Sequence, residues 1–523
     1  MSDWRRDLLV SLSLANLVYI RSWAEVLTFD RNAIYWLKSP PPPAYFLGLI
    51  LAIVALTVLI WLVLRQMARA KNHRVRRFLP FVFIVPLLTL LNSVRTLIGT
   101  PGQSLFLQFV QQRALAIGAA MALLAVIGLM VGGQRAQKLI SGILLLFFPL
   151  TLLAFGQAIY RIIYFDPSPM ADQPAASFLP AKPAGAPRFL WVIFDEWDQQ
   201  LSFAERPHTL ALPEIDRLRA QSLMATNTDT PAMMTDVSMP ALITGRRLAN
   251  VQAHGSSELL VQPAASREWL PWSQQPNVFD QARALGFNTA VVAWAIPYCR
   301  VINRSLSGCW WWSGSSQYNS TGTTAAQVFF NLPRGLFETV YRSPFGQSLS
   351  TVRHESTYEN VLRQSEAAIA SQQFGLILLH LPVPHPPYFY DPSTGRFTWG
   401  DHLLTGLLGS GQDGYLGGLA LVDRSIGELR SLMEQKGLWD STSILFSADH
   451  PFRHRPAFDG RPVDHRVPFL LKLAGQEREL HYDAPFSALL SKDLMLAVLG
   501  GQIATSGQAV AWLDRHAPSS LSD

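Results

Sequence analysis

The stretch Phe189-Leu-Trp-Val-Ile-Phe-Asp-Glu196 is an apolar run that ends in two carboxylates. A second run, Ser443-Ile-Leu-Phe-Ser-Ala-Asp-His450, ends in a carboxylate and an imidazole. A short apolar run bounded by polar residues is typical of a buried strand in a parallel sheet. Ligands of open α/β sheets bind at the carboxyl ends of such strands. The two stretches, far apart in the chain, therefore predict two halves of one metal site.

Strand and helix patterns alternate through the rest of the C-terminal part. This alternation predicts an α/β sandwich with a mainly parallel sheet between helices. The expected strands are 189–194, 288–294, 375–379, 443–446 and 467–472, and the expected helices include 213–219, 277–285 and 415–437.

The N-terminal third has the composition of a membrane domain. Apolar stretches lie near 8–28, 44–64, 79–99, 114–132 and 139–158, and each is close to the ~20 residues that a spanning helix needs. We expect an N-terminal transmembrane domain of about five helices over 1–165. A Pro/Ala-rich linker over 166–188 and an exported α/β domain over 189–523 should follow.

The distribution of basic residues orients these spans. Residues 1–187 hold 17 Lys/Arg against 6 Asp/Glu, whereas residues 188–523 hold 26 against 31. The basic loop between the second and third spans should be cytoplasmic, which places the large domain outside. The expected location is therefore the bacterial cytoplasmic (inner) membrane, with several spans and an extracytoplasmic, periplasmic catalytic domain. A nucleic-acid partner is not expected, because the basic excess lies outside the large domain.

The chain has two cysteines, Cys299 and Cys309, and both lie in the exported part. A local disulfide is expected in an oxidising compartment. Two unpaired thiols are the alternative.

Other polar groups follow the expected strands. Thr235 lies in the loop 230–246, His380 and His385 follow the strand 375–379, and His465 lies beyond His450. Each motif alone is compatible with a surface turn or a helix cap. Their common position after apolar strands favours a site, and mixed carboxylate and imidazole ligands favour zinc or manganese over magnesium.

The order of these motifs resembles the alkaline-phosphatase/sulfatase superfamily, above all its membrane-anchored phosphoethanolamine and phosphoglycerol transferases. The resemblance covers about residues 188–475. It rests on Pro213-Glu-Ile-Asp-Arg-Leu218, on Thr235-Asp-Val-Ser-Met-Pro240, on His380 to His385-Pro-Pro, on Ala448-Asp-His450 and on His465-Arg-Val-Pro468. The sequence departs from the family at Pro451, where the family usually has glycine.

The resemblance implies an alkaline-phosphatase-like fold and a role for each candidate residue. Thr235 would be the nucleophile, and a sulfatase that needs formylglycine is not expected because Thr235 replaces its cysteine. One or two divalent ions, zinc or manganese, would bind at Asp195, Glu196, Asp449 and His450. The remaining candidates are His385 and His465, for a second ion or for the phosphate and the leaving group, and His380 and Arg300, for substrate oxygens.

Three functions remain open at this point. The leading hypothesis is a metal-dependent transferase that moves a phospho-substituent from a phospholipid headgroup, through Thr235, to an envelope glycan or lipid. With water as the acceptor, the same site would make a phosphodiesterase or phosphatase. A catalytically inactive envelope assembly factor is the third, and Pro451 is the residue that favours it.

Overall fold

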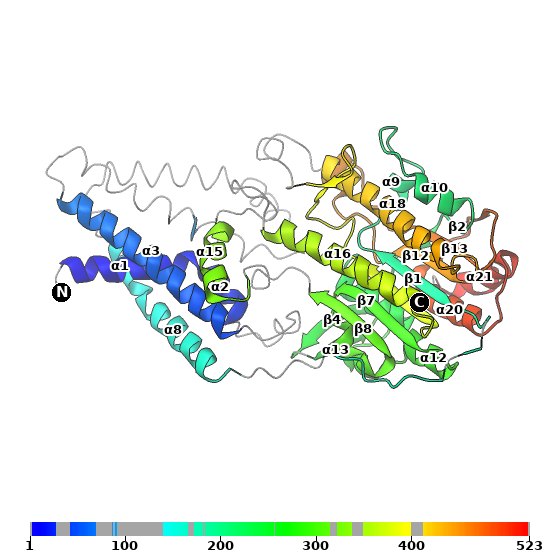
Figure 1. Ribbon diagram of the computed structural model, residues 1–523, viewed down its shortest axis with the longest axis horizontal. Coiled ribbons are helices and arrows are strands. Elements are labelled where there is room, and N and C mark those ends of the chain that lie inside the picture. The colour runs from blue at the N-terminus through cyan, green and yellow to red at the C-terminus, as the bar shows by residue number, and fades with distance from the viewer. Residues whose placement is uncertain are drawn as a thin grey trace. The chain divides into compact units, whose positions relative to one another are not determined.

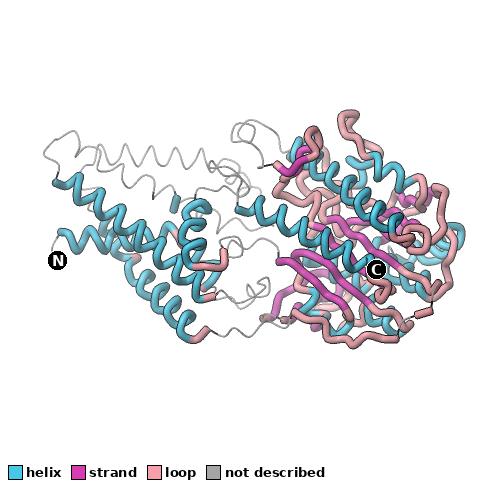
Figure 2. Tube along the Cα trace, viewed as in Figure 1, coloured by secondary structure: helices cyan, strands magenta, loops and turns pink. Residues whose placement is uncertain are grey.

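The computed structural model describes residues 3–27, 42–69, 86, 89–90, 140–165, 172–180, 182–183, 185–255, 257–313, 322–336, 349–398 and 412–520. The chain divides into two compact units. One unit combines the N-terminal helices with residues 316–350, and the other contains most of the chain from residue 169 onward. Figure 1 labels the elements, and Figure 2 distinguishes helices, strands and loops.

The second unit is built on an eight-stranded sheet with the order β14-β2-β13-β12-β1-β9-β7-β8. The neighbours β12, β1, β9, β7 and β8 run parallel, and β13 runs antiparallel to β12 and β2. The predicted α/β fold with a mainly parallel sheet is therefore confirmed. The strands are β1 (Phe189–Phe194), β2 (Leu223–Ala225), β7 (Thr289–Ala295), β8 (Gly308–Ser313), β9 (Leu376–Leu381), β12 (Ser443–Ala448), β13 (Phe469–Lys472) and β14 (Leu480–Tyr482).

Helices cover both faces of this sheet, which explains why every residue of β1, β9 and β12 is buried. Helix α16 (Leu349–Ala370) connects β8 to β9, and α18 (Gln412–Gln435) connects β9 to β12 (Figure 1). Both connections move in the same direction along the sheet, so right-handed crossovers place both helices on one face. The connection from β7 to β8, which contains α13 (Tyr298–Val301), moves in the other direction and lies on the opposite face.

Shorter elements surround the sheet, and one of them, α10, is capped by a side chain of α18. The side chain of Asp423, in α18, accepts a hydrogen bond from the backbone N–H of Ile215 at 2.8 Å and so caps α10. The shorter elements include α9 (Gln199–Ser202), α10 (Pro213–Arg219), β3 (Thr228–Asp229), α11 (Thr235–Thr244), β4 (Leu248–His254), β5 (Glu258–Pro263), β6 (Leu270–Pro271), α12 (Val278–Ala284), β10 (Tyr390–Asp391), β11 (Arg396–Phe397), α19 (Arg455–Asp459), β15 (Phe486–Ser487), α20 (Ser491–Leu499) and α21 (Ser506–Ser520).

The first unit contains two described helices that are long and apolar enough to cross a membrane, Pro43–Gln66 and Ile140–Ile163. They correspond to the predicted spans 44–64 and 139–158. The predicted span 8–28 instead forms two shorter helices, α1 (Asp3–Val18) and α2 (Ile20–Val26), because the helix is interrupted at Tyr19. The predicted spans 79–99 and 114–132 lie almost entirely outside the described residues. The five-span arrangement thus stays a prediction.

One helix of the first unit comes from a distant part of the sequence. Helix α15 (Ala325–Leu336) follows β8 in the chain but packs along α3 (Pro43–Arg69). A Cβ atom on Gly48 would lie 2.6 Å from Cβ of Val328 and 2.7 Å from the carbonyl oxygen of Ala325. Only glycine permits this close approach of the two helices. The sequence did not predict α15 or its position.

The ends of α3 contact different parts of the chain. Gly48, near the start of α3, meets α15. Near the other end, the indole N–H of Trp61 donates to the backbone carbonyl of Trp4 at 3.3 Å. The N-terminus of α1 therefore lies beside the end of α3 that carries Arg65 and Arg69.

Candidate active site

The carboxyl ends of β1 and β12 lie side by side. Their register pairs Phe194 with Ala448, so the residues that follow, Asp195 and Asp449, are neighbours. The carboxylate oxygen Oδ1 of Asp449 accepts the backbone N–H of His450 at 2.8 Å and that of Glu196 at 3.3 Å. The two strand ends thus meet at one edge of the sheet.

Three buried side chains at this edge could hold a metal ion. Asp195, Asp449 and His450 each offer one ligand atom, and these atoms lie within 4.8 Å of one another. Nε2 of His450 is 3.6 Å from Oδ1 of Asp195 and 3.4 Å from Oδ2 of Asp449. These two carboxylate oxygens are buried and have no hydrogen-bond partner among the described residues. Buried acceptors of this kind are costly unless something satisfies them, so the donor set fits a divalent cation such as zinc or manganese.

The electrostatics of the cluster also favour a cation. Burial, and then the charges of Asp449 and Glu196, raise the pKa of Asp195 well above its usual value. A bound cation would stabilise the ionised form of this carboxylate.

Thr235 stands at the first residue of α11, beside this cluster. Its hydroxyl donates to Oδ2 of Asp195 at 3.2 Å and lies 3.2 Å from Nε2 of His450. Thr235 is only partly buried. It therefore lies between the buried cluster and the surface of the unit.

The second hydroxyl of this loop, that of Ser238, has a different environment. Ser238 is fully buried, and its hydroxyl donates to the backbone carbonyl of Asp449 at 2.5 Å. Helix α11 ends at Gly245, whose φ of 67° gives the left-handed cap that glycine favours. Ser238 thus ties α11 to the end of β12, whereas Thr235 faces the cluster.

Glu196 differs from its predicted position among the metal ligands. Its backbone has a φ of 67°, a left-handed conformation that is uncommon for a residue with a side chain. Its carboxylate oxygen Oε1 accepts hydrogen bonds from Arg453, at 2.7 Å from Nε and 2.6 Å from Nη2. Burial alone would raise the pKa of Glu196, but His385 and Arg453 lower it. In this structure Glu196 is an ion-pair partner of Arg453 and is not among the three candidate ligands Asp195, Asp449 and His450. Its predicted role as a metal ligand stays a prediction.

Two of the predicted histidines lie close to the cluster. Nε2 of His380, a residue of β9, is 3.8 Å from Oδ2 of Asp195, and Nδ1 is 3.2 Å from the hydroxyl of Tyr298. Burial lowers the pKa of His380 to about 4, so its ring is neutral at neutral pH. His385 packs its ring against Trp294 at a centroid distance of 5.3 Å and is close enough to Glu196 for their charges to interact.

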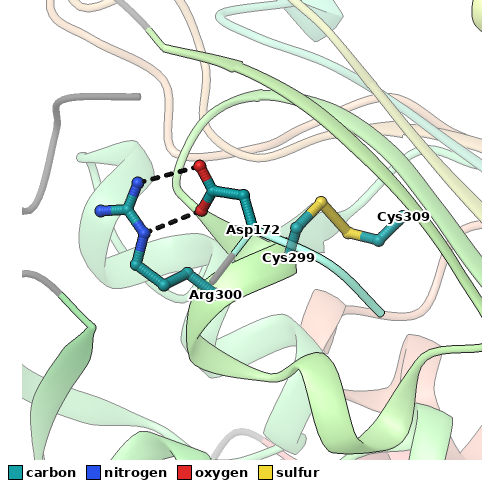
Figure 3. Close-up of a disulfide and its surroundings, with 4 residues drawn as sticks. All are labelled: Asp172, Cys299, Arg300 and Cys309. Carbon is teal, nitrogen blue, oxygen red and sulfur yellow. Dashed lines mark hydrogen bonds and ion pairs between the residues drawn. A yellow bond between two sulfur atoms is a disulfide. The ribbon is translucent and has the colours of Figure 1, made fainter. Parts of the chain in front are cut away.

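Two other predicted residues are not brought to the cluster by the contacts of the described residues. His465 is exposed, and its backbone carbonyl accepts a hydrogen bond from Thr230 at 3.0 Å. Arg300 is buried and forms an ion pair with Asp172, at 2.8 Å from Nε and 3.1 Å from Nη2 (Figure 3). Arg300 thus anchors the segment before β1.

Next to this ion pair, Cys299 and Cys309 form a disulfide with their Cα atoms 5.4 Å apart (Figure 3). The disulfide connects α13 to β8, the strand at the edge of the sheet.

Sequence reasoning missed Arg453, Trp294 and His354 as neighbours of the site. The position of Arg453 could have indicated its proximity to the site, because it is a basic residue three positions after His450 in the loop that follows β12. Trp294 and His354 had none, since their contact, with ring centroids 5.2 Å apart, joins β7 to α16 across the fold.

Comparison with known proteins adds a family. The sequence profile of the sulfatase family matches residues 187–500, more than half of the chain. No curated protein sequence matches the chain. Solved structures that are similar include a phosphonate monoester hydrolase from Silicibacter pomeroyi, with 15% identity, 60% of this chain and 73% of that chain covered, and a TM-score of 0.43. A sulfatase from Pseudoalteromonas sp. is 14% identical, with 60% of this chain and 68% of that chain covered and a TM-score of 0.40. A protein in the alkaline phosphatase superfamily from Vibrio parahaemolyticus is 13% identical, with 64% of this chain and 71% of that chain covered and a TM-score of 0.38.

Proposed function

Because the chain belongs to the sulfatase family, we propose that it is a metal-dependent transferase with Thr235 as the covalent carrier. It moves a phospho-substituent from a phospholipid headgroup to an envelope glycan or lipid. One observation carries this proposal: the hydroxyl of Thr235 lies 3.2 Å both from the carboxylate of Asp195 and from the imidazole of His450. A threonine hydroxyl becomes a useful nucleophile only when such groups activate it.

Asp195, Asp449 and His450 would hold the ion, which is zinc or manganese in this proposal. When bound, a divalent ion lowers the pKa of a neighbouring hydroxyl and polarises a phosphoryl oxygen. Such an ion would also satisfy the two buried carboxylate oxygens that have no hydrogen-bond partner among the described residues.

In this proposal the phospho-substituent is transferred twice, first to Thr235 and then to the acceptor. The Thr235 hydroxyl loses its proton along its hydrogen bond to Asp195 and attacks phosphorus. A bond forms between Oγ1 and phosphorus, the bond from phosphorus to the diacylglycerol oxygen breaks, and diacylglycerol leaves with a proton. A hydroxyl of the acceptor then attacks phosphorus, and the bond from phosphorus to Oγ1 breaks. The acceptor's proton passes to His385, and Thr235 takes back the proton held by Asp195.

The predicted roles of the remaining residues are part of the same proposal. His380 contacts a substrate oxygen, supported by its distance of 3.8 Å from Asp195. His385 gives a proton to the leaving oxygen, and its interaction with Glu196 supports a position near the cluster. His465 has no such support, because it is exposed.

Hydrolysis is the second candidate function, and the partial exposure of Thr235 favours it. Water that reaches Thr235 would replace the acceptor hydroxyl in the second step. The first step and its residues would be unchanged.

A membrane location is supported by the surface of the two long apolar helices. Leu59 is 59% exposed, Leu146 76% and Leu153 67%. Large apolar patches are rare on soluble proteins and are expected where helices face lipid. A phospholipid donor would then be available in the same membrane.

The placement of basic residues supports the proposed orientation. Arg65 and Arg69 lie at the end of α3, and basic residues are enriched on the cytoplasmic side of spanning helices. In the proposed orientation the large domain lies on the extracytoplasmic side, in the envelope.

The proposed function is tested with the purified full-length protein in vesicles that contain a phospholipid labelled in its headgroup phosphate. Release of diacylglycerol together with label on an added glycan or lipid acceptor is the expected result. Label in a free phospho-alcohol would indicate the hydrolase instead. If no diacylglycerol is released and the protein holds no metal, the inactive assembly factor would be the remaining hypothesis.

A further inference from the structure

Arg453 is the basic residue that forms an ion pair with a carboxylate next to the metal ligands. Nε and Nη2 both bind Oε1 of Glu196, and the positive charge also acts on Asp195 and Asp449. The side chain is 23% exposed, whereas that of Glu196 is fully buried. Arg453 therefore connects the buried carboxylates to a surface that substrate can reach.

The third nitrogen of this guanidinium has a weak partner. Nη1 donates to Sδ of Met234 at 2.8 Å, and a thioether is a weak acceptor. Met234 directly precedes Thr235 at the start of α11. An anionic oxygen on a group that reaches Thr235 would be a far stronger acceptor for Nη1 than this sulfur.

Arg453 also decides how many ions the cluster needs. Three carboxylates, those of Asp195, Glu196 and Asp449, are fully buried here, and one divalent ion together with one guanidinium balances the charge of these three. Arg453 also acts on the less deeply buried carboxylate of Asp236. Without Arg453, the buried carboxylate of Glu196 would lose its ion pair, although the charges of His385, His450 and His454 also act on it. Its Oε2 has no hydrogen-bond partner among the described residues.

We propose that Arg453 acts as the second cation of the site. It keeps Glu196 out of the coordination of a single metal ion, and it binds an oxygen of the phospho-substituent through Nη1. This inference rests on the proposed function, because it assigns the anion of the same reaction.

The test uses the full-length protein and two probes, zinc and inorganic phosphate. Bound zinc per chain is counted by elemental analysis after excess metal is removed, and phosphate affinity is measured by calorimetry. We expect one ion per chain in the unsubstituted protein. Arg453→Met should weaken phosphate binding by about 10- to 100-fold, the range for one charge-assisted hydrogen bond, and should raise zinc above one ion because Glu196 becomes free. Arg453→Lys should keep one ion.

Two further variants make the result unambiguous. Arg461→Met is the control, because Arg461 lies in the same connection between β12 and β13, beyond α19, but pairs with Glu205. It should change neither zinc binding nor phosphate binding. The double variant Glu196→Gln with Arg453→Met removes both buried charges, so it avoids an unpaired carboxylate if the single variant does not fold. It should hold one ion and still bind phosphate weakly.

Phosphate affinity that is unchanged in both Arg453→Met variants would overturn the inference, as would two zinc ions in the unsubstituted protein. In either case the proposed function still stands if turnover continues. An unsubstituted protein that binds neither zinc nor phosphate would instead remove the proposed function and this inference together.

Discussion

Oγ1 of Thr235 lies 3.2 Å from Nε2 of His450, although 215 positions separate the two residues in the chain. The sheet creates this proximity, because β12 is the direct neighbour of β1 and the start of α11 lies at the same edge. Ser238 secures the arrangement through its hydrogen bond to the backbone of Asp449. The proposed nucleophile and the candidate metal ligands therefore depend on the same edge of the sheet.

Asp449→Asn should reduce metal binding while the fold is kept. The amide can retain the hydrogen bonds from His450 and Glu196 to Oδ1, but it removes the charge that a divalent ion needs. We expect affinity for zinc to fall by more than the ~10- to 100-fold typical of an outer-shell partner. Metal titration of the full-length protein checks this.

The control is Asp423→Asn, a change at a buried carboxylate that caps α10. The amide oxygen can keep the hydrogen bond from Ile215, so the change should alter stability little and leave zinc affinity unchanged. Equal zinc affinity in the Asp449 and Asp423 variants would show that the strand ends are not the metal site.

Gly48→Leu should displace α15 from α3, because any Cβ at this position would lie 2.6 Å from Cβ of Val328. Gly156→Leu is the control, since nothing lies within 4 Å of a Cβ there. No free cysteine is present among the described residues, so Val328→Cys can report on the contact. Its buried thiol should react with a maleimide only when Gly48 is replaced. Equal maleimide labelling of Val328→Cys in the Gly48→Leu and Gly156→Leu proteins would contradict the packing of α15 on α3.

His354 should make stability depend on pH. Its Nε2–H donates to the carbonyl oxygens of Pro382 and His385, and burial lowers its pKa from 6.5 to about 3. The unfolded chain binds a proton below 6.5 while the folded ring stays neutral, so this stability is complete above pH 6.5 and is lost as pH falls towards 3. At about pH 5 the loss is about 2 kcal/mol.

His354→Gln removes this titration. In metal-free protein, the Tm of the variant should therefore fall less than that of the unsubstituted protein between about pH 7 and about pH 5. Parallel Tm curves would show that His354 is not the group responsible.

Reporter fusions check the orientation. An alkaline phosphatase reporter, active only outside the cytoplasm, should be active after residue 165 and silent after residue 72. The reverse pattern would place the large domain in the cytoplasm and remove its access to an envelope acceptor.

The sequence predicted those parts of the fold whose signals are local. Strand β1 has the predicted bounds because six consecutive apolar residues are buried on both faces. Strand β9 extends two residues further than predicted, and includes His380, because a buried polar side chain that faces the cluster breaks the apolar pattern. The antiparallel direction of β13 could not be predicted, since periodicity does not encode strand direction.

The remaining differences depend on contacts between distant residues. The packing of α15 requires Gly48, which lies far upstream in the chain. The pairing of Glu196 with Arg453, and of Arg300 with Asp172, decides which charged groups are available to a ligand. No local pattern distinguishes these ion pairs from ligand-binding residues.

The most direct test of the central claim is to find where the phospho-substituent is attached. The full-length protein is incubated with labelled phospholipid, quenched and digested, and the peptides are read by mass spectrometry. The adduct is expected on Thr235, and Thr235→Ala should lose turnover by roughly 10⁴-fold or more while zinc binding is largely kept. Ser238→Ala is the control, and it should still form the adduct. If Thr235→Ala keeps near-normal turnover and no residue carries an adduct, the covalent mechanism is contradicted.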